Sequence, residues 1–119
     1  MGDDDLVQAL RAICGEAGVL AGADLATRAG DWLGLMPCRA RAVALPHTTA
    51  EVSAVMRLCH DRGQPVVAAG GLTGLVHGAD AGPDDVQLSF ERMRALGPID
   101  PLGRTLVAEA GVPLQAVPA

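Results

Sequence analysis

The stretch from Ala42 to Gly74, AVALPHTTAEVSAVMRLCHDRGQPVVAAGGLTG, decides the fold of this chain. Its first residues, Ala42–Leu45, form a short apolar run that predicts a strand, which Pro46 closes. Thr48 stands three residues before Glu51, and this spacing is typical of a capping box at the start of a helix. The sequence therefore predicts a strand that leads directly into a helix.

The predicted helix has one apolar face, because its apolar residues recur at positions i, i+3, i+4 and i+7. Gly63 suits the left-handed position that ends a helix. Gln64-Pro65 then turns the chain into Val66–Ala69, an apolar run that we expect to be a buried strand. A strand–helix–strand unit implies parallel strands. The residues of the apolar face are Val52, Val55, Met56 and Cys59.

The strand Val66–Ala69 runs into a glycine-rich loop, Gly70-Gly71-Leu72-Thr73-Gly74. Adjacent glycines expose backbone N–H groups without a Cβ atom in the way, and such a concavity suits a phosphate or diphosphate. The alternative is an ordinary tight turn, since the chain has 15 glycines. The loop is nevertheless the best candidate for a binding site.

Two familiar phosphate-binding loops do not fit this segment. A Walker loop needs a lysine, and the chain has none. A Rossmann loop leads straight into a helix, whereas Leu75–Pro83, LVHGADAGP, cannot begin a helix of useful length. We therefore expect a strand–loop–strand cradle built from backbone amides, with Thr73 as a further donor.

Upstream, the spacing of apolar residues predicts a first helix that Asp5 caps and Gly18 ends. The apolar residues that define it are Leu6, Ala9, Leu10, Ile13 and Ala17. Residues 18–41 are interrupted by glycine and proline, and we expect a connecting segment with one helical turn.

Downstream, Gly82-Pro83-Asp84 predicts a turn and Val86–Ser89 a strand. Residues 93–96 suggest a helical turn, and Arg104–Ala108 suggests a further strand. The last residues resemble the opening of a helix.

Composition narrows the function further. At 119 residues the chain is one domain or a piece of one, and its net charge of −5 argues against general binding to nucleic acid. The cysteines at positions 14, 38 and 59 are far apart, so they fit buried thiols in a reducing compartment better than a metal site. No apolar stretch approaches the length of a membrane span or a secretory signal. We expect a soluble, cytoplasmic chain.

Several polar residues have an ordinary structural explanation. His77 and His60 are expected to be exposed, and Cys59 to lie in the core. Asp80, Asp84 and Asp85 are expected to form turns rather than a metal site. Arg92 and Arg94 are expected to be surface charges.

Several motifs, in order and at familiar spacing, resemble the FAD-binding domain of the vanillyl-alcohol-oxidase (PCMH) type. The resemblance is strongest to the D-2-hydroxyacid, D-2-hydroxyglutarate and D-lactate dehydrogenase and glycolate oxidase branch. The motifs are Asp31-Trp32, Ala42–Pro46 with Thr49-x-Glu51-Val52, the loop Gly70–Gly74, Leu88–Met93 and Glu109–Val112.

The resemblance implies an α+β fold, with a small β-α-β-led sheet and an N-terminal helix forming the first lobe of such a domain. It divides the chain into an N-terminal helix and connecting segment, residues 1–41, and a partial FAD-binding domain, residues 42–119. The implied function is FAD binding within an enzyme that oxidises a D-2-hydroxyacid. His47 is expected near the adenine end of FAD. The implied FAD contacts are Gly70, Gly71, Leu72, Thr73, Gly74, Gly78, Ala79 and Pro46.

Members of this family are several times longer, and their catalytic and metal-binding residues lie in the part that follows. No catalytic or metal-binding residue is therefore expected in this chain, which alone is expected to be inactive. Two alternatives remain open. The first is a non-catalytic nucleotide- or phosphate-binding module, and the second is one half of a split enzyme that needs a partner chain.

Overall fold

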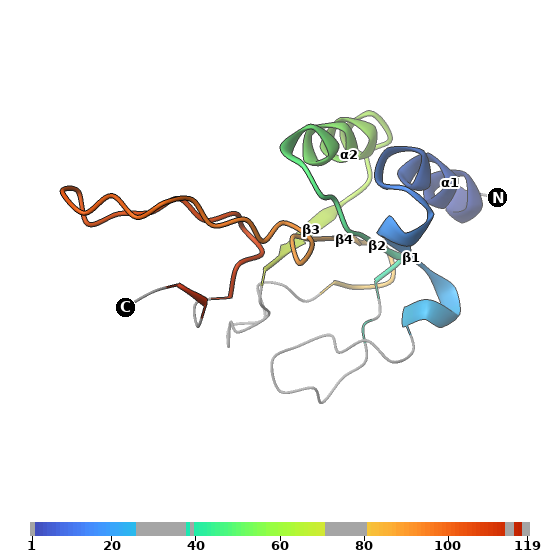
Figure 1. The fold of residues 1–119 in the computed structure, drawn as a ribbon. Helices are drawn as coiled ribbons and strands as arrows, with labels where there is room; N and C mark the ends of the chain where they lie inside the picture. Colours follow the sequence, from blue (N-terminus) through green and yellow to red (C-terminus); the bar gives the residue numbers. More distant parts are fainter. Residues whose placement is uncertain (1, 26–37, 39, 71–80, 114–115, 118–119) are drawn as a thin grey trace.

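The computed structural model describes residues 2–25, 38, 40–70, 81–113 and 116–117. Two helices pack on one face of a four-stranded mixed sheet (Figure 1), which confirms the predicted α+β class. The elements are α1 (Gly2–Cys14), β1 (Val19–Leu20), β2 (Ala42–Ala44), α2 (Thr49–Asp61), β3 (Val66–Ala69) and β4 (Val86–Ser89), with single 3₁₀ turns at Glu16–Gly18 and Gly22–Leu25.

The strand order is β1-β2-β4-β3. Strands β2, β4 and β3 are parallel, and β1 pairs antiparallel to β2. The parallel direction predicted for the strand–helix–strand unit is confirmed, but β4 lies between its two strands. The prediction that Val66–Ala69 is buried is wrong for most of that strand. In the described part of the sheet β3 pairs only with β4, which leaves Ala68 exposed and the two valines half-buried, whereas all of β4 is buried.

The main hydrophobic core lies between the two helices and the sheet. From α1 it takes Leu6 and Leu10, and from α2 it takes Val55 and Cys59, as predicted for the last two. These side chains pack with Val86 and its neighbours in the sheet. The core thus contains residues on both sides of the division at residues 41 and 42, and that division remains a prediction.

The boundaries predicted for α1 are wrong. The helix begins at Gly2 instead of after Asp5, and it ends at Cys14 instead of at Gly18. Gly15 ends it, because its φ of 86° is open to glycine and strained for other residues. Gly18 is buried beyond the helix, in a 3₁₀ turn. β1, which follows, was not predicted, since two residues are too few to show a periodicity.

The predicted ends of α2 are confirmed. Thr48 Oγ1 accepts a hydrogen bond from the backbone N–H of Glu51 at 3.1 Å. At the other end Gly63 has a φ of 63°, and its N–H donates to the carbonyl of His60 at 3.1 Å. The N–H of Gln64 donates to the carbonyl of Cys59 at 2.8 Å, which completes a Schellman motif.

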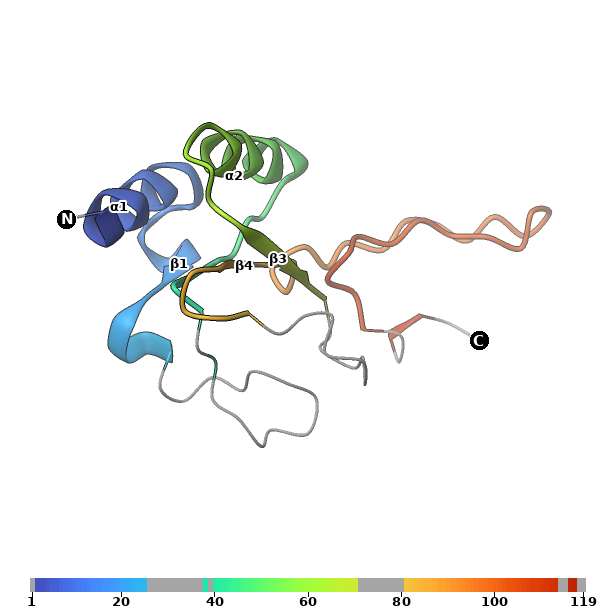
Figure 2. The same ribbon diagram turned by 180° about the vertical axis from the view of Figure 1, so that it is seen from behind.

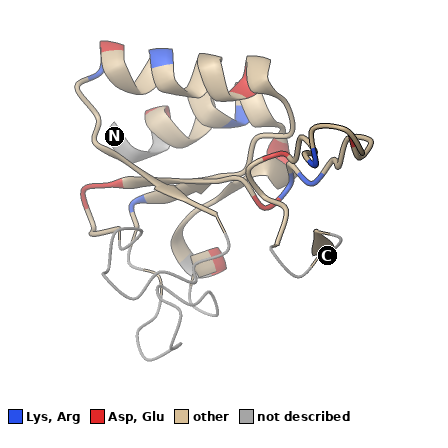
Figure 3. Ribbon diagram, turned by 90° about the vertical axis from the view of Figure 1, so that its left-hand side faces the viewer, with Lys and Arg blue, Asp and Glu red and all other residues tan. Residues whose placement is uncertain are grey.

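One member of the predicted apolar face of α2 is misplaced. Met56 is 45% exposed, whereas Val55 and Cys59 are buried and Val52 is half-buried. The face that contacts α1 and the sheet is therefore narrower than the apolar pattern suggested. The charged residues of this helix, Glu51, Arg57 and Asp61, lie outside its buried face (Figure 3).

Residues 94–109 form a projecting hairpin, which we call the arm (Figure 2). It is held by isolated bridges from Leu96 to Ala108 and from Asp100 to Thr105, with a turn in which Arg104 has a φ of 55°. The predicted helical turn at residues 93–96 is wrong, and residues 104–108 pair only through these bridges instead of forming a continuous strand. Beyond the arm, the N–H of Ala116 donates to the carbonyl of Pro113 at 2.9 Å, and the neighbouring residues of the predicted terminal helix lie outside the described part.

Candidate functional site

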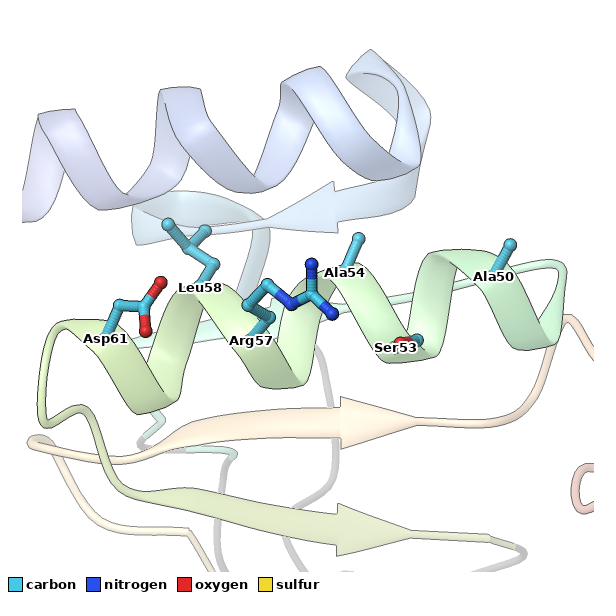
Figure 4. A pocket seen from close by; sticks show the side chains of 6 residues that line it. All are labelled: Ala50, Ser53, Ala54, Arg57, Leu58 and Asp61. Carbon is cyan, nitrogen blue, oxygen red and sulfur yellow. The ribbon is translucent and has the colours of Figure 1, made fainter.

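The carboxyl ends of the three parallel strands meet at one edge of the sheet. β2 leads into Leu45-Pro46, β3 into Gly70, and β4 into Phe90. In open sheets with parallel strands, ligands bind beyond this edge. Figure 4 shows two of the strands with their arrowheads on the side where Ala50 marks the first turn of α2. We call this side the carboxyl edge.

The structure places two of the predicted FAD contacts at the carboxyl edge. Gly70 is exposed, and the carbonyl of the preceding Ala69 accepts a hydrogen bond from the N–H of Phe90 at 3.0 Å. Pro46 is fully buried at the end of β2. Contact of these two residues with FAD remains a prediction. The other predicted contacts, Gly71, Leu72, Thr73, Gly74, Gly78 and Ala79, lie outside the described residues, as does His77.

The segment that contains Gly111 packs against the same edge, a contact that the sequence did not predict. The N–H of Gly111 donates to the carbonyl of Met93 at 2.9 Å. A Cβ atom at Gly111 would overlap the carbonyl oxygen of Phe90 and lie 2.6 Å from its carbonyl carbon. A Cβ at Gly70 would meet only the carbonyl oxygen of Ala110, at 3.5 Å. The backbone of Gly70 is thus exposed to solvent on one side, and the segment with Ala110 lies on the other side.

Arg92, predicted to be a surface charge, is half-buried. Its Nη2 lies 2.7 Å from Nδ1 of His47, which joins the segment after β4 to the segment after β2. Its Nη1 is buried with no hydrogen-bond partner. A Cβ at Gly18 would lie 2.6 Å from this nitrogen, so the missing side chain of Gly18 makes room for the guanidinium. Arg94 is exposed, as predicted.

The three cysteines are free and buried, as expected for thiols that fill a core. Burial raises the pKa of Cys14, the carboxylate of Glu51 raises it further, and the guanidinium of Arg92 opposes this. Burial also raises the pKa of Cys59, with Arg62 opposing. Both thiols are therefore neutral and poor nucleophiles in the folded chain.

These raised pKa values predict a loss of stability in alkali. The unfolded chain ionises its thiols near the ordinary value of about 8.5, while the folded chain holds them protonated. The contribution of the two protonated thiols to the free energy of unfolding is fully present below that pH. It is lost as the pH rises toward the higher pKa values of the folded chain. We expect the free energy of unfolding, measured by urea denaturation, to fall as the pH rises above about 8.5. The Cys14→Ala variant should show a shallower fall. An equally steep fall would contradict the raised pKa of Cys14.

Three cavities among the described residues lie away from the carboxyl edge. A groove of about 420 Å³ runs along α2 and is lined from that helix alone (Figure 4). A cavity of about 630 Å³ lies beside the arm and includes Ile99, Arg104 and Val117. A smaller one, of about 330 Å³, includes Arg41 and Gln64 near the opposite end of the strands.

The described residues hold no group of three metal-ligating side chains. Asp85 instead forms the predicted turn: its Oδ2 accepts from the N–H of Gly82 at 2.8 Å, and its N–H donates to the Gly82 carbonyl at 3.0 Å. His60 is exposed, as predicted. In the same part of the chain no helix is long and apolar enough to cross a membrane.

Comparison with known proteins identifies the family. Residues 40–119 match the model of the FAD binding domain, which covers more than half of the chain. The chain is therefore a member of the FAD-binding domain family, and the resemblance seen in its motifs is confirmed.

Among individual relatives, the chain is 39% identical over 95 residues to D-2-hydroxyglutarate dehydrogenase of Xanthomonas citri pv. viticola, covering 80% of this chain and 20% of that protein. It is 34% identical over 114 residues to a probable mitochondrial D-2-hydroxyglutarate dehydrogenase of Oryza sativa subsp. indica, covering 95% of this chain and 20% of the relative. The chain thus spans a fifth of the length of these relatives.

Solved structures support the same fold. A structure of p-cresol methylhydroxylase with bound substrate superimposes with a TM-score of 0.72 at 23% identity, covering 94% of this chain and 23% of that one. Alkyldihydroxyacetonephosphate synthase gives a TM-score of 0.74 at 18% identity, covering 92% and 24%. At these identities the likeness concerns the fold alone.

The carboxyl edge fits the cofactor of this family. The backbone of Gly70 is exposed at the carboxyl edge, and a diphosphate needs a close approach to such a main chain. The imidazole of His47, backed by Arg92, adds a polar group at the same edge. FAD is the cofactor that the family indicates.

Proposed function

We propose that this chain is the first lobe of the FAD site of a flavin-dependent oxidoreductase that acts on a D-2-hydroxyacid. The observation that carries the proposal is the family match over residues 40–119, together with 39% identity to a D-2-hydroxyglutarate dehydrogenase. When bound, FAD supplies the acceptor for the hydride of the substrate.

In this proposal the chain binds and orients the cofactor and contributes no acid or base. The loop Gly70–Gly74, with Gly78 and Ala79, holds the diphosphate through backbone amides. Pro46 closes β2 beneath the bound dinucleotide. The residues that bind and deprotonate the hydroxyacid belong to the four-fifths of the relatives that this chain does not match. The chain alone is therefore proposed to be inactive.

FAD binding is tested by a titration that follows thermal stability and flavin absorption between about 350 and 500 nm. At a ligand concentration 100 times the dissociation constant, binding stabilises the folded state by about 2.7 kcal/mol. We expect a saturable rise in the melting temperature. The Gly70→Ala variant should fold normally, because its Cβ meets one atom at an ordinary contact distance. It should show a smaller rise, because alanine restricts the main-chain conformations open to the start of the loop.

The matched control is Gly82→Ala, which adds the same methyl group in a turn away from the carboxyl edge. It should respond to FAD like the unmodified chain. If the unmodified chain shows neither bound flavin nor a rise in melting temperature, independent FAD binding by this lobe is refuted.

The arm favours a split or incomplete enzyme over a self-sufficient module. Leu102 is 96% exposed and Val107 is 79% exposed, and Leu96 and Ile99 are also exposed along the same hairpin. Apolar side chains gathered on one projection mark a surface that another polypeptide covers. We propose that the part of the enzyme corresponding to the unmatched four-fifths of these relatives covers it. The test adds the part of a relative that this chain does not match. Flavin binding, or oxidation of D-2-hydroxyglutarate, that appears only after this addition would support the proposal.

The second candidate function is a nucleotide-binding module without catalysis, which the exposed backbone at Gly70 favours. Binding of ADP or FAD with no effect of an added carboxyl-terminal fragment would support it. We also propose a cytoplasmic location, because the three cysteines are free thiols, as a reducing compartment would keep them.

A further inference from the structure

A cavity of about 330 Å³ lies at the amino ends of the parallel strands, on the side opposite the carboxyl edge. In Figure 4 the two drawn strands begin on this side, where Asp61 ends α2. The cavity is lined from α1, from the residue before β2 and from the segment that joins α2 to β3. Two of its four lining residues are arginines, although the chain as a whole has a net charge of −5. The lining residues are Leu6, Arg41, Arg62 and Gln64.

Gln64 holds the guanidinium of Arg41 at this cavity. Gln64 is 9% exposed, and its side-chain amide is engaged by both its oxygen and its nitrogen. Its Oε1 accepts from Nη1 of Arg41 at 2.5 Å. Its Nε2 donates to the carbonyls of Pro65 at 2.9 Å and of Asp84 at 2.6 Å. The amide is thus anchored to the segments before β3 and β4, and it orients Arg41 from there.

The backbone of Arg41 is fixed as well. Its N–H donates to the carbonyl of Asp85 at 2.8 Å, and the next residue begins β2, which is buried throughout. The carboxylate of Asp85 accepts from the N–H of Gly82 at 2.8 Å, so this acidic group belongs to the turn before β4. Arg41 therefore carries its charge at a position that the sheet determines.

Arg62 brings a second positive charge to the cavity from the end of α2. It is the C-cap residue, and its backbone N–H donates to the carbonyl of Leu58 at 3.2 Å. Within the described part of the chain, no hydrogen bond or ion pair engages its guanidinium. A cation at the carboxyl end of a helix is favourable by itself. This effect explains Arg62 alone, but it does not explain a second arginine held at the same cavity.

Two guanidinium groups at one cavity select an oxyanion. A guanidinium stays charged, and its planar set of donors matches two oxygens of a carboxylate or a phosphate. The third polar residue, Gln64, is neutral, so it does not balance this charge. Small-molecule sites range from about 300 to 1,000 Å³, and a cavity of about 330 Å³ lies at the lower end of that range. A small anion therefore fits better than a nucleotide.

We propose that Arg41 and Arg62 form a binding site for a small oxyanion, a carboxylate or a phosphate, at the amino ends of the strands. Gln64 is the positioning residue that orients Arg41. A bound anion would join the end of α2 to the start of β2. The proposal does not depend on the proposed function, because this cavity and the carboxyl edge lie at opposite ends of the strands.

The first test titrates the complete 119-residue chain with sodium phosphate and, separately, with sodium succinate. The side-chain Nε–H signals of the arginines are followed by ¹H–¹⁵N NMR. Sodium chloride at equal ionic strength is the reference, because salt screens every exposed charge. We expect saturable shifts of the Arg41 and Arg62 signals beyond the effect of chloride. Saturation by either anion supports the site, and the lower half-saturation concentration identifies the preferred class of oxyanion.

The second test removes one charge at a time. Arg62→Met should fold normally, because Arg62 is exposed, and it should weaken anion binding about tenfold, as for one lost hydrogen bond to a charged group. The matched control is Arg57→Met, which removes the same charge from an exposed position on the same helix. Arg57 lines the groove along α2 instead of this cavity, so the control should bind the anion like the unmodified chain.

The third test concerns the arginine that Gln64 orients. Arg41→Met should abolish saturable binding, whereas Arg41→Lys keeps the charge without the planar set of donors and should retain part of it. If Arg41→Met does not fold, the comparison of Arg62→Met with Arg57→Met still decides the proposal.

The absence of a saturable shift with both anions would overturn the proposal. An equal loss of affinity in Arg57→Met and Arg62→Met would also overturn it, since the effect would then belong to the charge of the whole surface. Neither outcome touches the proposed function, which is tested by the response of the melting temperature to FAD. Conversely, anion binding by a chain that does not respond to FAD would leave this site in place and count against independent FAD binding alone.

Discussion

Gly111→Ala is expected to destabilise the chain by about 3 kcal/mol or more, at the upper end of the range for overpacking. The Cβ of the alanine would overlap the carbonyl oxygen of Phe90 and lie 2.8 Å from that of Met93. Both obstacles are backbone atoms, which cannot rotate out of the way as a side chain would. The measurement is the midpoint of urea denaturation at constant slope.

The same substitution should also reduce FAD binding. The hydrogen bond from Gly111 to Met93 holds the segment that supports Gly70 from behind, and a displaced segment would leave the cradle without this support. Gly82→Ala is the control, since its nearest neighbour would be a carboxylate oxygen at 3.5 Å. An equal and small change in stability in both variants would show that the backbone around Gly111 moves easily to make room for a Cβ atom.

Leu10→Ala is expected to cost about 2–5 kcal/mol, the usual range for a leucine truncated in a closed core. Leu10 is fully buried between α1, α2 and the sheet. Since a domain of this size is stable by only about 5–15 kcal/mol, the loss is a large share of the total. Thermal and urea denaturation give the free energy directly.

Gln8→Ala provides the control, because Gln8 is exposed on the same helix. It should change stability by about 0.5 kcal/mol or less. A chain that begins at residue 40, where the family match starts, should not fold on its own, since it lacks the α1 half of the core. A stable shortened chain would support the division at residues 41 and 42 as a true domain boundary.

The sequence correctly predicted the helices and strands that are defined by residues close together in the chain. Thr48, Glu51 and Gly63 define α2 by capping chemistry that depends on neighbouring residues alone. Short apolar runs between turn residues predicted β2, β3 and β4. These signals act over a few residues, so reading them does not require knowledge of the fold.

The predictions that were wrong concern features that depend on contacts between residues far apart in the sequence. Arg92 was expected at the surface, but the absence of a side chain at Gly18, 74 positions earlier, makes room for it. The arm is held by isolated bridges, which leave no periodic pattern. At the site, the sequence identified the glycine loop and Pro46 as candidates. It did not predict that His47 and Arg92 would meet, because their contact joins the ends of two strands.

The position of β3 at one side of the sheet affects how this chain behaves at high concentration. Among the described residues β3 pairs only with β4, so the other side of this four-residue strand has no strand partner there, and the strand leads directly into Gly70. Such a side can accept an additional strand from another molecule. A preparation concentrated for crystallisation or NMR would thus tend to self-associate next to the region where flavin is proposed to bind, and ligand would compete with self-association. Dilution series with and without FAD are therefore part of any quantitative study of this lobe.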